Sequence, residues 1–306
     1  MGGTNTLETS QKSKSVFAIW ISLVANIVLT FLKIIVGFLY SSQVLIADGI
    51  HNAGDIIASV AALGATSVSK KPADEDHPYG HGKAEVIAAA IVAIILIIAA
   101  IFMGYSSFSA LFEPAVKASM IGLTAAIISL VVKQLLYGYC MRLGKKENSK
   151  SLIATAYDHL ADVYSSIAAV IGIGLALIGD HYNIAILRYG DPVAGIVVSF
   201  FVLKLAVEIG KEAIDVLMET TVPAEQLEKY TNVVQLIPEV KRIDRIRARE
   251  HGHYVIVDIR VGIPGYYTIQ QGHDISRHIK QNIMDAYQEV DEVLVHLNPW
   301  YEDEER

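Results

Sequence analysis

Two pairs of metal-ligating side chains stand at the same spacing within apolar stretches of this 306-residue sequence. His51 and Asp55 lie in the segment ADGIHNAGD, and Asp158 and Asp162 lie in AYDHLADVYSS. Residues four apart share one face of a helix, with Cβ atoms about 5–6 Å apart. Two such helices facing each other would place one imidazole and three carboxylates around a shared point. This pattern predicts a four-ligand cage for a divalent cation, and the ion would offset the cost of burying the carboxylates.

The alternative interpretation of these acids is structural. A charged side chain at the centre of a bilayer costs at least about 2.5–3.5 kcal/mol, and such acids also serve as hydrogen-bonding contacts between helices. Three lysines of the apolar stretches are available as ion-pair partners: Lys33, Lys133 and Lys204. We favour metal binding because the same spacing recurs in the two apolar stretches that acids and a histidine interrupt.

Three more polar residues stand beside the candidate ligands. Asp48 precedes His51 by three residues, and we expect it either to assist cation access or to be solvated. Asn52 and His159 each follow a candidate ligand directly and point about 100° away from it on a helix. We expect both of them in structural or supporting roles.

The elements that must position these residues are membrane helices. The sequence is 53% hydrophobic with a mean hydropathy of +0.41, and its apolar residues collect into runs long enough, at about 18 or more, to cross a bilayer. Four runs are clear: 15–40, 84–112, 119–141 and 191–215. Two more, 43–68 and 151–178, carry the candidate ligands. We therefore predict six transmembrane helices within residues 15–217.

The composition changes after about residue 220, where charged residues become frequent. We expect a helix after Pro223, then two alternating strands at 240–250 and 253–263 joined by a turn at His251-Gly252. A second helix over 268–288 and a third strand at 291–299 follow. This order predicts a small αββαβ domain over residues 218–306, with its helices packed on one face of the sheet.

Charges in the loops orient the chain in the membrane. Lysine and arginine are frequent at one set of span ends, and the opposite loops carry little beyond Lys117 and Arg188. We therefore expect the tail at residues 1–14 and the C-terminal domain to be cytoplasmic, in a multi-pass protein of the inner or plasma membrane. A net charge of −7 gives no support to a nucleic-acid partner. One cysteine, Cys140, excludes an intrachain disulfide framework.

With these motifs in view, the sequence resembles a cation diffusion facilitator over nearly its whole length. The resemblance rests on the six spans, the two ligand pairs, the loop DEDHPYGHGKAE at residues 74–85 and the αββαβ tail. It implies proton-coupled export of divalent transition metals by a homodimer whose cytoplasmic domains pack together. The transport site of the family falls on the residues that spacing had selected: His51, Asp55, Asp158 and Asp162.

The resemblance also implies a second metal site in the loop between the second and third spans, formed by Asp74, His77 and His81. A carboxylate and two imidazoles at spacings of three and four suit a metal ion. The alternative is a solvated acidic loop in which His81 caps the third span. Lys83 resembles a family lysine that forms a salt bridge just after the sixth span, and its partner here would be Glu219. We expect this pair to act as a structural hinge.

Family members further hold a metal site in the cytoplasmic domain at the dimer interface. The residues that agree with it here are Asp258, His273 and His296. Two positions depart from the family, since Ile243 stands where a histidine is used and Asn298 replaces an aspartate. His251 and His253 in the predicted turn are alternative sources of ligands.

Three carboxylates and one imidazole form an oxygen-rich set that suits Mn²⁺ and Fe²⁺, while Zn²⁺ and Co²⁺ bind nearly any such site. In the family, the Asp-x-x-x-Asp pair is common among manganese and iron exporters, and the His-x-x-x-Asp pair among zinc exporters. We predict a proton-coupled antiporter that exports Mn²⁺ first, with Zn²⁺, Fe²⁺ and Co²⁺ as alternatives. The metal is its substrate and a regulator, and we expect no catalytic cofactor.

Two other classes of function, a metal sensor and a metallohydrolase, fit the sequence less well than transport does. A membrane metal sensor, whose cytoplasmic domain signals metal binding, would have no reason to bury four polar ligands among its spans. An intramembrane metallohydrolase needs a general base or nucleophile besides its ligands, and the sequence has neither an HExxH motif nor such a group beside the two pairs. We therefore expect a transporter rather than an enzyme.

Overall fold

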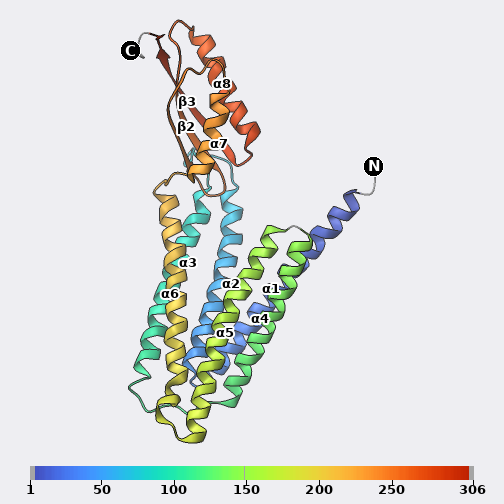
Figure 1. Ribbon diagram of the computed structural model, residues 1–306, viewed down its shortest axis with the longest axis vertical. Helices are drawn as coiled ribbons and strands as arrows, with labels where there is room; N and C mark the ends of the chain where they lie inside the picture. The colour runs from blue at the N-terminus through green and yellow to red at the C-terminus, as the bar shows by residue number, and fades with distance from the viewer. Residues whose placement is uncertain (1–3, 148, 303–306) are drawn as a thin grey trace. The chain divides into compact units, whose positions relative to one another are not determined.

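The structure is a computed structural model that describes residues 4–147 and 149–302. Its N-terminal part is built of long helices that lie alongside one another (Figure 1). A short 3₁₀ helix, η1 (Ala185–Tyr189), precedes the last of them. The long helices are α1 (Thr4–Leu39), α2 (Gln43–Ser69), α3 (Lys83–Ser109), α4 (Met120–Lys146), α5 (Lys150–Tyr182) and α6 (Gly190–Leu217).

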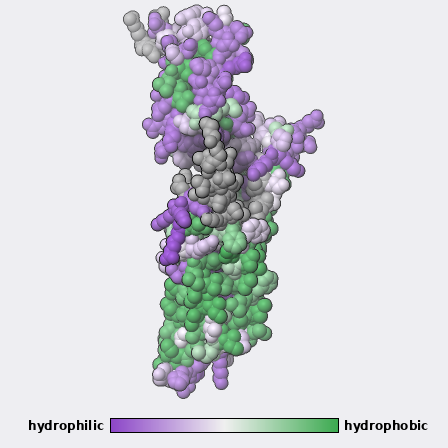
Figure 2. All heavy atoms as spheres, turned by 90° about the vertical axis from the view of Figure 1, so that its right-hand side faces the viewer, coloured by the Kyte–Doolittle hydropathy of each residue, from purple (hydrophilic) through white to green (hydrophobic). Residues whose placement is uncertain are grey.

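Within the described residues, six helices are long and apolar enough to cross a membrane, so the predicted six spans are confirmed. Large apolar side chains such as Phe102 and Phe200 are more than half exposed on them, and the face drawn in Figure 2 is predominantly hydrophobic along these helices. Lipid rather than water suits such a surface. The fourth helix runs five residues beyond the predicted 141, to Lys146, because basic residues are favourable in the last turn of a helix.

Local sequence fixes several of the ends of α4 and α5. The Oγ of Ser119 accepts a hydrogen bond from the Ile121 amide and caps α4, and the Oγ of Ser149 accepts one from Leu152 and caps α5. The fifth helix ends at Asn183, whose φ of 57° is the left-handed conformation that commonly closes a helix.

The chain divides into two compact units. The first comprises Met1–Val60 and Ile91–Glu208, and the second comprises Ala61–Ala90 and Ile209–Arg306. The core of the first unit is rich in small side chains, including Ala47, Ala126 and Ala169. Small residues allow helix backbones to approach closely in a membrane domain, and this packing holds the polar side chains of α2 and α5 in place.

The C-terminal part of the second unit has the predicted αββαβ order. Strand β2 pairs antiparallel with β1 and parallel with β3, so β2 is central. Thr268 caps the second helix in a reciprocal capping box with Gln271. Alternate β2 residues pack in one core with the buried face of that helix. The elements are α7 (Ala224–Gln235), β1 (Arg242–Glu250), β2 (Val255–Pro264), α8 (Ile269–Ala286) and β3 (Val290–Trp300).

Candidate metal centre

Three of the four predicted transport-site residues gather inside the membrane helices. His51 and Asp55 come from α2 and Asp162 comes from α5, and their ligating atoms all lie within 4.8 Å of one another. The Nε2 of His51 is 3.7 Å from Oδ1 of Asp162. Asp162 is buried, and the two α2 residues are partly buried. One imidazole and two carboxylates at this separation are a suitable ligand set for a divalent cation.

Asp158, the fourth predicted ligand, lies apart from this cluster. It is an exposed residue of α5, and its carboxylate is not among those that gather with His51. One helical turn, about 5.4 Å, separates it from Asp162 along the axis. Asp158 and Asp162 thus share one face of α5, as their spacing predicted. Only Asp162, however, gathers with His51 and Asp55 of α2.

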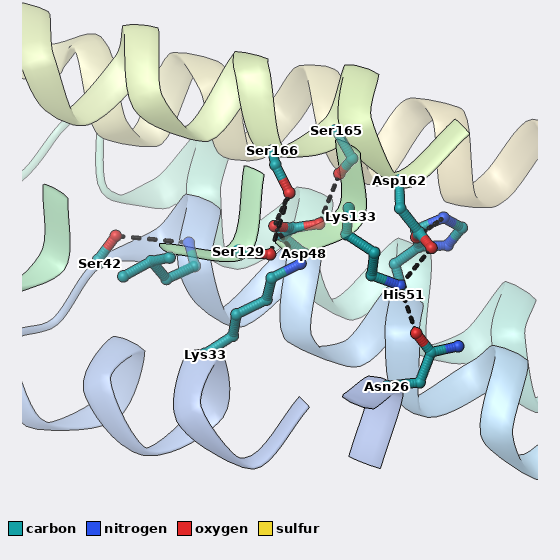
Figure 3. Close-up of polar contacts among 11 residues, drawn as sticks. Asn26, Lys33, Ser42, Asp48, His51, Ser129, Lys133, Asp162, Ser165 and Ser166 are labelled. Carbon is teal, nitrogen blue, oxygen red and sulfur yellow. Dashed lines mark hydrogen bonds and ion pairs between the residues drawn. The ribbon is translucent and has the colours of Figure 1, made fainter. Parts of the chain in front are cut away.

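The structure places the ammonium group of a lysine at this site. Lys133 of α4 donates from Nζ to Oδ2 of Asp162 and, over 2.7 Å, to the side-chain oxygen of Asn26 on α1 (Figure 3). The Lys133 side chain has no exposed surface. Asp162 thus presents one oxygen to Lys133 and the other to His51. The sequence had marked Lys133 as a partner for a buried acid, because it is a charge in an apolar stretch, but had not marked Asn26.

A second buried ion pair joins α1 to α2. The Nζ of Lys33 is 2.7 Å from Oδ2 of Asp48, and neither side chain is exposed. Two serines of α5 also donate to this carboxylate, Ser165 over 2.8 Å and Ser166 over 3.5 Å (Figure 3). Asp48 is therefore not solvated, because its carboxylate is buried and α1 and α5 supply its donors. Its expected role in cation access stays a prediction.

Asn52 connects the two ion pairs. In the amide orientation that satisfies both of its ends, its nitrogen donates to Oδ1 of Asp162 over 2.9 Å and its oxygen accepts from Lys33 over 3.1 Å. This is the supporting role expected for it. His159 is 1% exposed, and within the described part of the chain neither of its ring nitrogens has a hydrogen-bond partner.

The loop residues also gather. The ligating atoms of Asp74, His77 and His81 lie within 4.8 Å of one another. Asp74 accepts a hydrogen bond from the His77 amide over 2.7 Å, and its other oxygen is 3.4 Å from Nε2 of His81. The backbone hydrogen bond from His77 is the main reason that the pKa of Asp74 is lowered, with the histidine rings adding to it. The charged form of the carboxylate is thereby favoured.

The turn between β1 and β2 lies against the backbone of this loop. Gly80, between the two histidines, has a φ of 81°, and Tyr254 donates from its hydroxyl to the carbonyl oxygen of the neighbouring Tyr79. A Cβ on Gly252, whose φ is 78°, would lie 2.1 Å from the carbonyl oxygen of Gly82. Only glycine combines this φ with such a close approach.

The predicted pair between the start of α3 and the segment after α6 is present as an ion pair. The Nζ of Lys83 lies 3.3 Å from Oε1 of Glu219, and Nε of Arg249 lies 3.7 Å from Oε2 of the same glutamate. Glu219 has a φ of 60°. All three residues belong to the second compact unit. Glu219 therefore links the segment after α6 to α3 through Lys83 and to β1 through Arg249.

Among the described residues, the three predicted metal ligands of the C-terminal domain do not gather around a shared point. Asp258 of β2 is held 2.8 Å from Nη1 of Arg249, and His296 of β3 lies 3.1 Å from Oδ1 of Asn298. Both alternate with core residues and therefore point away from the helices. His273 is exposed on α8, which covers the other face of the sheet.

Comparison with known proteins identifies the family to which the chain belongs. A model of the cation efflux transmembrane domain matches residues 19–218, and one of the cation efflux protein cytoplasmic domain matches residues 222–300. Manganese efflux system protein MneP of Bacillus subtilis is 44% identical over 92% of this chain and 95% of its own length.

Two further relatives match at a similar extent. Manganese efflux system protein MneS of Bacillus subtilis is 33% identical over 91% of this chain and 93% of its own length. The uncharacterized transporter MJ0449 of Methanocaldococcus jannaschii is 32% identical over 91% and 96%. Both family models match, and the structure has six membrane helices followed by an αββαβ domain. The chain therefore belongs to the cation diffusion facilitator family of metal-efflux transporters.

Proposed function

We propose that this protein exports Mn²⁺ from the cytoplasm in exchange for protons. The observation that carries the proposal is the cluster of His51, Asp55 and Asp162 inside the membrane helices of a metal-efflux transporter. Polar ligands among membrane-spanning helices are costly to bury, and a bound cation would offset that cost. A cluster shared by two helices can also be opened to either side when those helices move.

Manganese is the proposed substrate on two grounds. Two carboxylates and one imidazole form an oxygen-rich set, which suits Mn²⁺ better than thiolate-rich or histidine-rich sites do. Two relatives that align over nine-tenths of the chain are named manganese efflux system proteins. Zn²⁺, Fe²⁺ and Co²⁺ remain competitors, because each binds mixed nitrogen and oxygen ligands.

Proton coupling follows from the chemistry of the ligands. Carboxylates and imidazoles bind metal only in their deprotonated forms, so metal binding releases protons and protonation releases metal. Histidine side chains change charge near neutral pH, which makes His51 the proposed carrier of the coupled proton. We propose that Asp158 joins the ligand set in another conformation, since it lies one turn from Asp162 on α5.

The remaining parts of the chain are assigned regulatory and structural roles. We propose that Asp74, His77 and His81 bind a second metal ion, and that the αββαβ domain pairs with a second copy of the chain. Asp258, His273 and His296 lie on two sides of one domain, so they would share a metal only with ligands from the second copy. The lysines at span ends support cytoplasmic termini in a cell membrane.

Transport by the purified protein in liposomes tests the proposal. With an acidic interior, Mn²⁺ added outside should accumulate, and protons should leave the lumen as it does so. Asp55→Asn removes one ligand charge at constant size and should abolish both fluxes. Lys204→Gln, on an exposed residue of α6, should leave both unchanged. Metal-independent proton loss, or full Mn²⁺ uptake by Asp55→Asn, would contradict the proposal, and metal binding without any flux would favour a sensor.

A further inference from the structure

We propose that Lys133 is a tethered cation that competes with the transported metal for Asp162. This inference rests on the proposed function and assigns a new residue to it. Lys133 neutralises Asp162 when no metal is bound, and it must give up that carboxylate when metal arrives. It therefore weakens metal binding and speeds the return of the empty transporter.

The contacts of Lys133 support this role. Its Nζ contacts Oδ2 of Asp162, while Oδ1 of the same carboxylate faces His51. The lysine and the aspartate are both buried, at 0% and 2% exposed. A divalent ion bound at Oδ1 would place three positive charges on the two oxygens of one carboxylate. Repulsion between like charges is strong where water is scarce, so metal and Lys133 exclude each other at Asp162.

Asn26 gives Lys133 a second place to bind. Its side-chain oxygen accepts from Nζ over 2.7 Å (Figure 3). When metal takes Asp162, Lys133 keeps this hydrogen bond and remains partnered on α1. A neutral acceptor is suitable here, because a carboxylate in place of Asn26 would hold the lysine permanently. The contacts of Lys133 with α1 and α5 thus depend on whether metal is bound between α2 and α5.

The ion pair of Lys33 with Asp48 serves as a comparison for the ion pair of Lys133 with Asp162. Lys33 and Asp48 are buried and paired in the same way, 2.7 Å apart, but Asp48 is not among the residues that gather around a shared point. A structural lysine should behave like Lys33 when it is replaced. A competing lysine should instead change affinity and turnover in opposite directions.

The consequences for the transport cycle have definite signs. Without the ammonium, metal no longer competes for Asp162, so the dissociation constant and KM for Mn²⁺ should fall. The empty transporter would then carry an unpaired carboxylate among its helices, which is costly to bury, so its return should slow and kcat should fall. Loss of a merely structural contact would raise KM or unfold the protein, and it would not tighten metal binding.

Calorimetric Mn²⁺ binding to the full-length protein in detergent, in a background carrying Asp74→Ala, His77→Ala and His81→Ala, tests this inference. Lys133→Gln should tighten binding at least about tenfold and lower kcat in liposomes by a similar factor. Lys133→Met, which adds no oxygen ligand, should tighten binding as well. Lys133→Arg keeps the charge and should stay within about threefold of the parent.

Two further variants keep the test decisive if Lys133→Gln does not fold. Asn26→Leu removes the alternative acceptor and should weaken Mn²⁺ binding, the opposite sign to Lys133→Gln. Lys33→Gln, the matched buried-lysine control, should lower stability without tightening binding. Unchanged or weaker binding in Lys133→Gln and Lys133→Met, or tighter binding in Asn26→Leu, would overturn the inference. Failure of the parent protein to bind Mn²⁺ would instead refute the proposed function.

Discussion

The ammonium of Lys33 lies 2.7 Å from the carboxylate of Asp48, and neither side chain has any exposed surface. Removing water from two charges is expensive, and their attraction offsets that cost only when both are present and hydrogen-bonded. Ser165 and Ser166 supply the further donors that Asp48 needs. The membrane domain thus contains a charged pair that lies beside the cluster of His51, Asp55 and Asp162 without belonging to it.

We predict that Asp48→Asn will destabilise the protein by about 3–5 kcal/mol, because it leaves the Lys33 charge buried without its partner. Reversible unfolding of the purified protein in mixed detergent micelles measures this change. The double variant Lys33→Met, Asp48→Leu removes both charges and should recover most of the loss. A single variant as stable as the parent would show that Lys33 is solvated.

The backbone contact at Gly252 leads to a second prediction. Gly252→Ala places a Cβ at 2.1 Å from a carbonyl oxygen and strains a φ of 78°, so the hairpin turn must move away from Gly82. Amide hydrogen exchange over residues 70–82 should then accelerate at least about tenfold, since opening of this loop becomes easier.

Gly64→Ala is the matched control for this experiment. Among the residues that the structure describes, a Cβ at Gly64 in α2 would meet nothing within 4 Å, and alanine in a helix is favoured over glycine by roughly 0.5–1 kcal/mol. Exchange over residues 70–82 should therefore be the same as in the parent. Equal protection of the loop in Gly252→Ala and Gly64→Ala would contradict the structural role of the contact.

A pH dependence follows from His251 in the same turn. Burial lowers its pKa, and the charge of Lys83 lowers it further, against the opposing effect of Glu219. The folded turn favours the neutral ring, so its stabilisation is complete above the unfolded pKa of about 6.5. It is lost progressively as the pH falls from there through the lower pKa of the folded state. Corrected for intrinsic rates, exchange at Gly252–Tyr254 should be faster at about pH 5.5 than at about pH 7.5.

Substitution of the two histidines in this turn isolates the cause. His251→Phe keeps a ring of similar shape and should remove the difference between the two pH values. His253→Phe, at an exposed position of the turn, should retain it. A difference that persists in His251→Phe would assign the pH dependence to another group.

Most of the fold follows from patterns that are local in the sequence. Apolar runs of sufficient length predicted the six spans. Alternation of apolar and polar residues predicted the strands of the αββαβ domain, and helix-start signals such as Thr268 predicted its helices. The parallel pairing of β2 with β3 was not predicted, because it joins strands that are far apart in the chain. The grouping of residues 61–90 with the C-terminal part is likewise a matter of tertiary contacts.

The site shows the same division between local and distant information. Spacing along one helix identified the pairs on α2 and α5, but it could not say which carboxylate of α5 lies level with His51. That depends on how α5 is placed beside α2, and the structure selects Asp162 over Asp158. The partners of the buried charges come from α1 and α4, and Asn26 gives no signal of its own in the sequence.

Pulsed electron paramagnetic resonance of bound Mn²⁺ shows whether His51 coordinates the ion. In protein that carries Asp74→Ala, His77→Ala and His81→Ala, one bound Mn²⁺ should show coupling to an imidazole nitrogen. The same coupling should vanish in His51→Asp, which replaces the imidazole by a carboxylate and should still bind the ion. Nitrogen coupling that survives in His51→Asp would contradict the proposed metal centre.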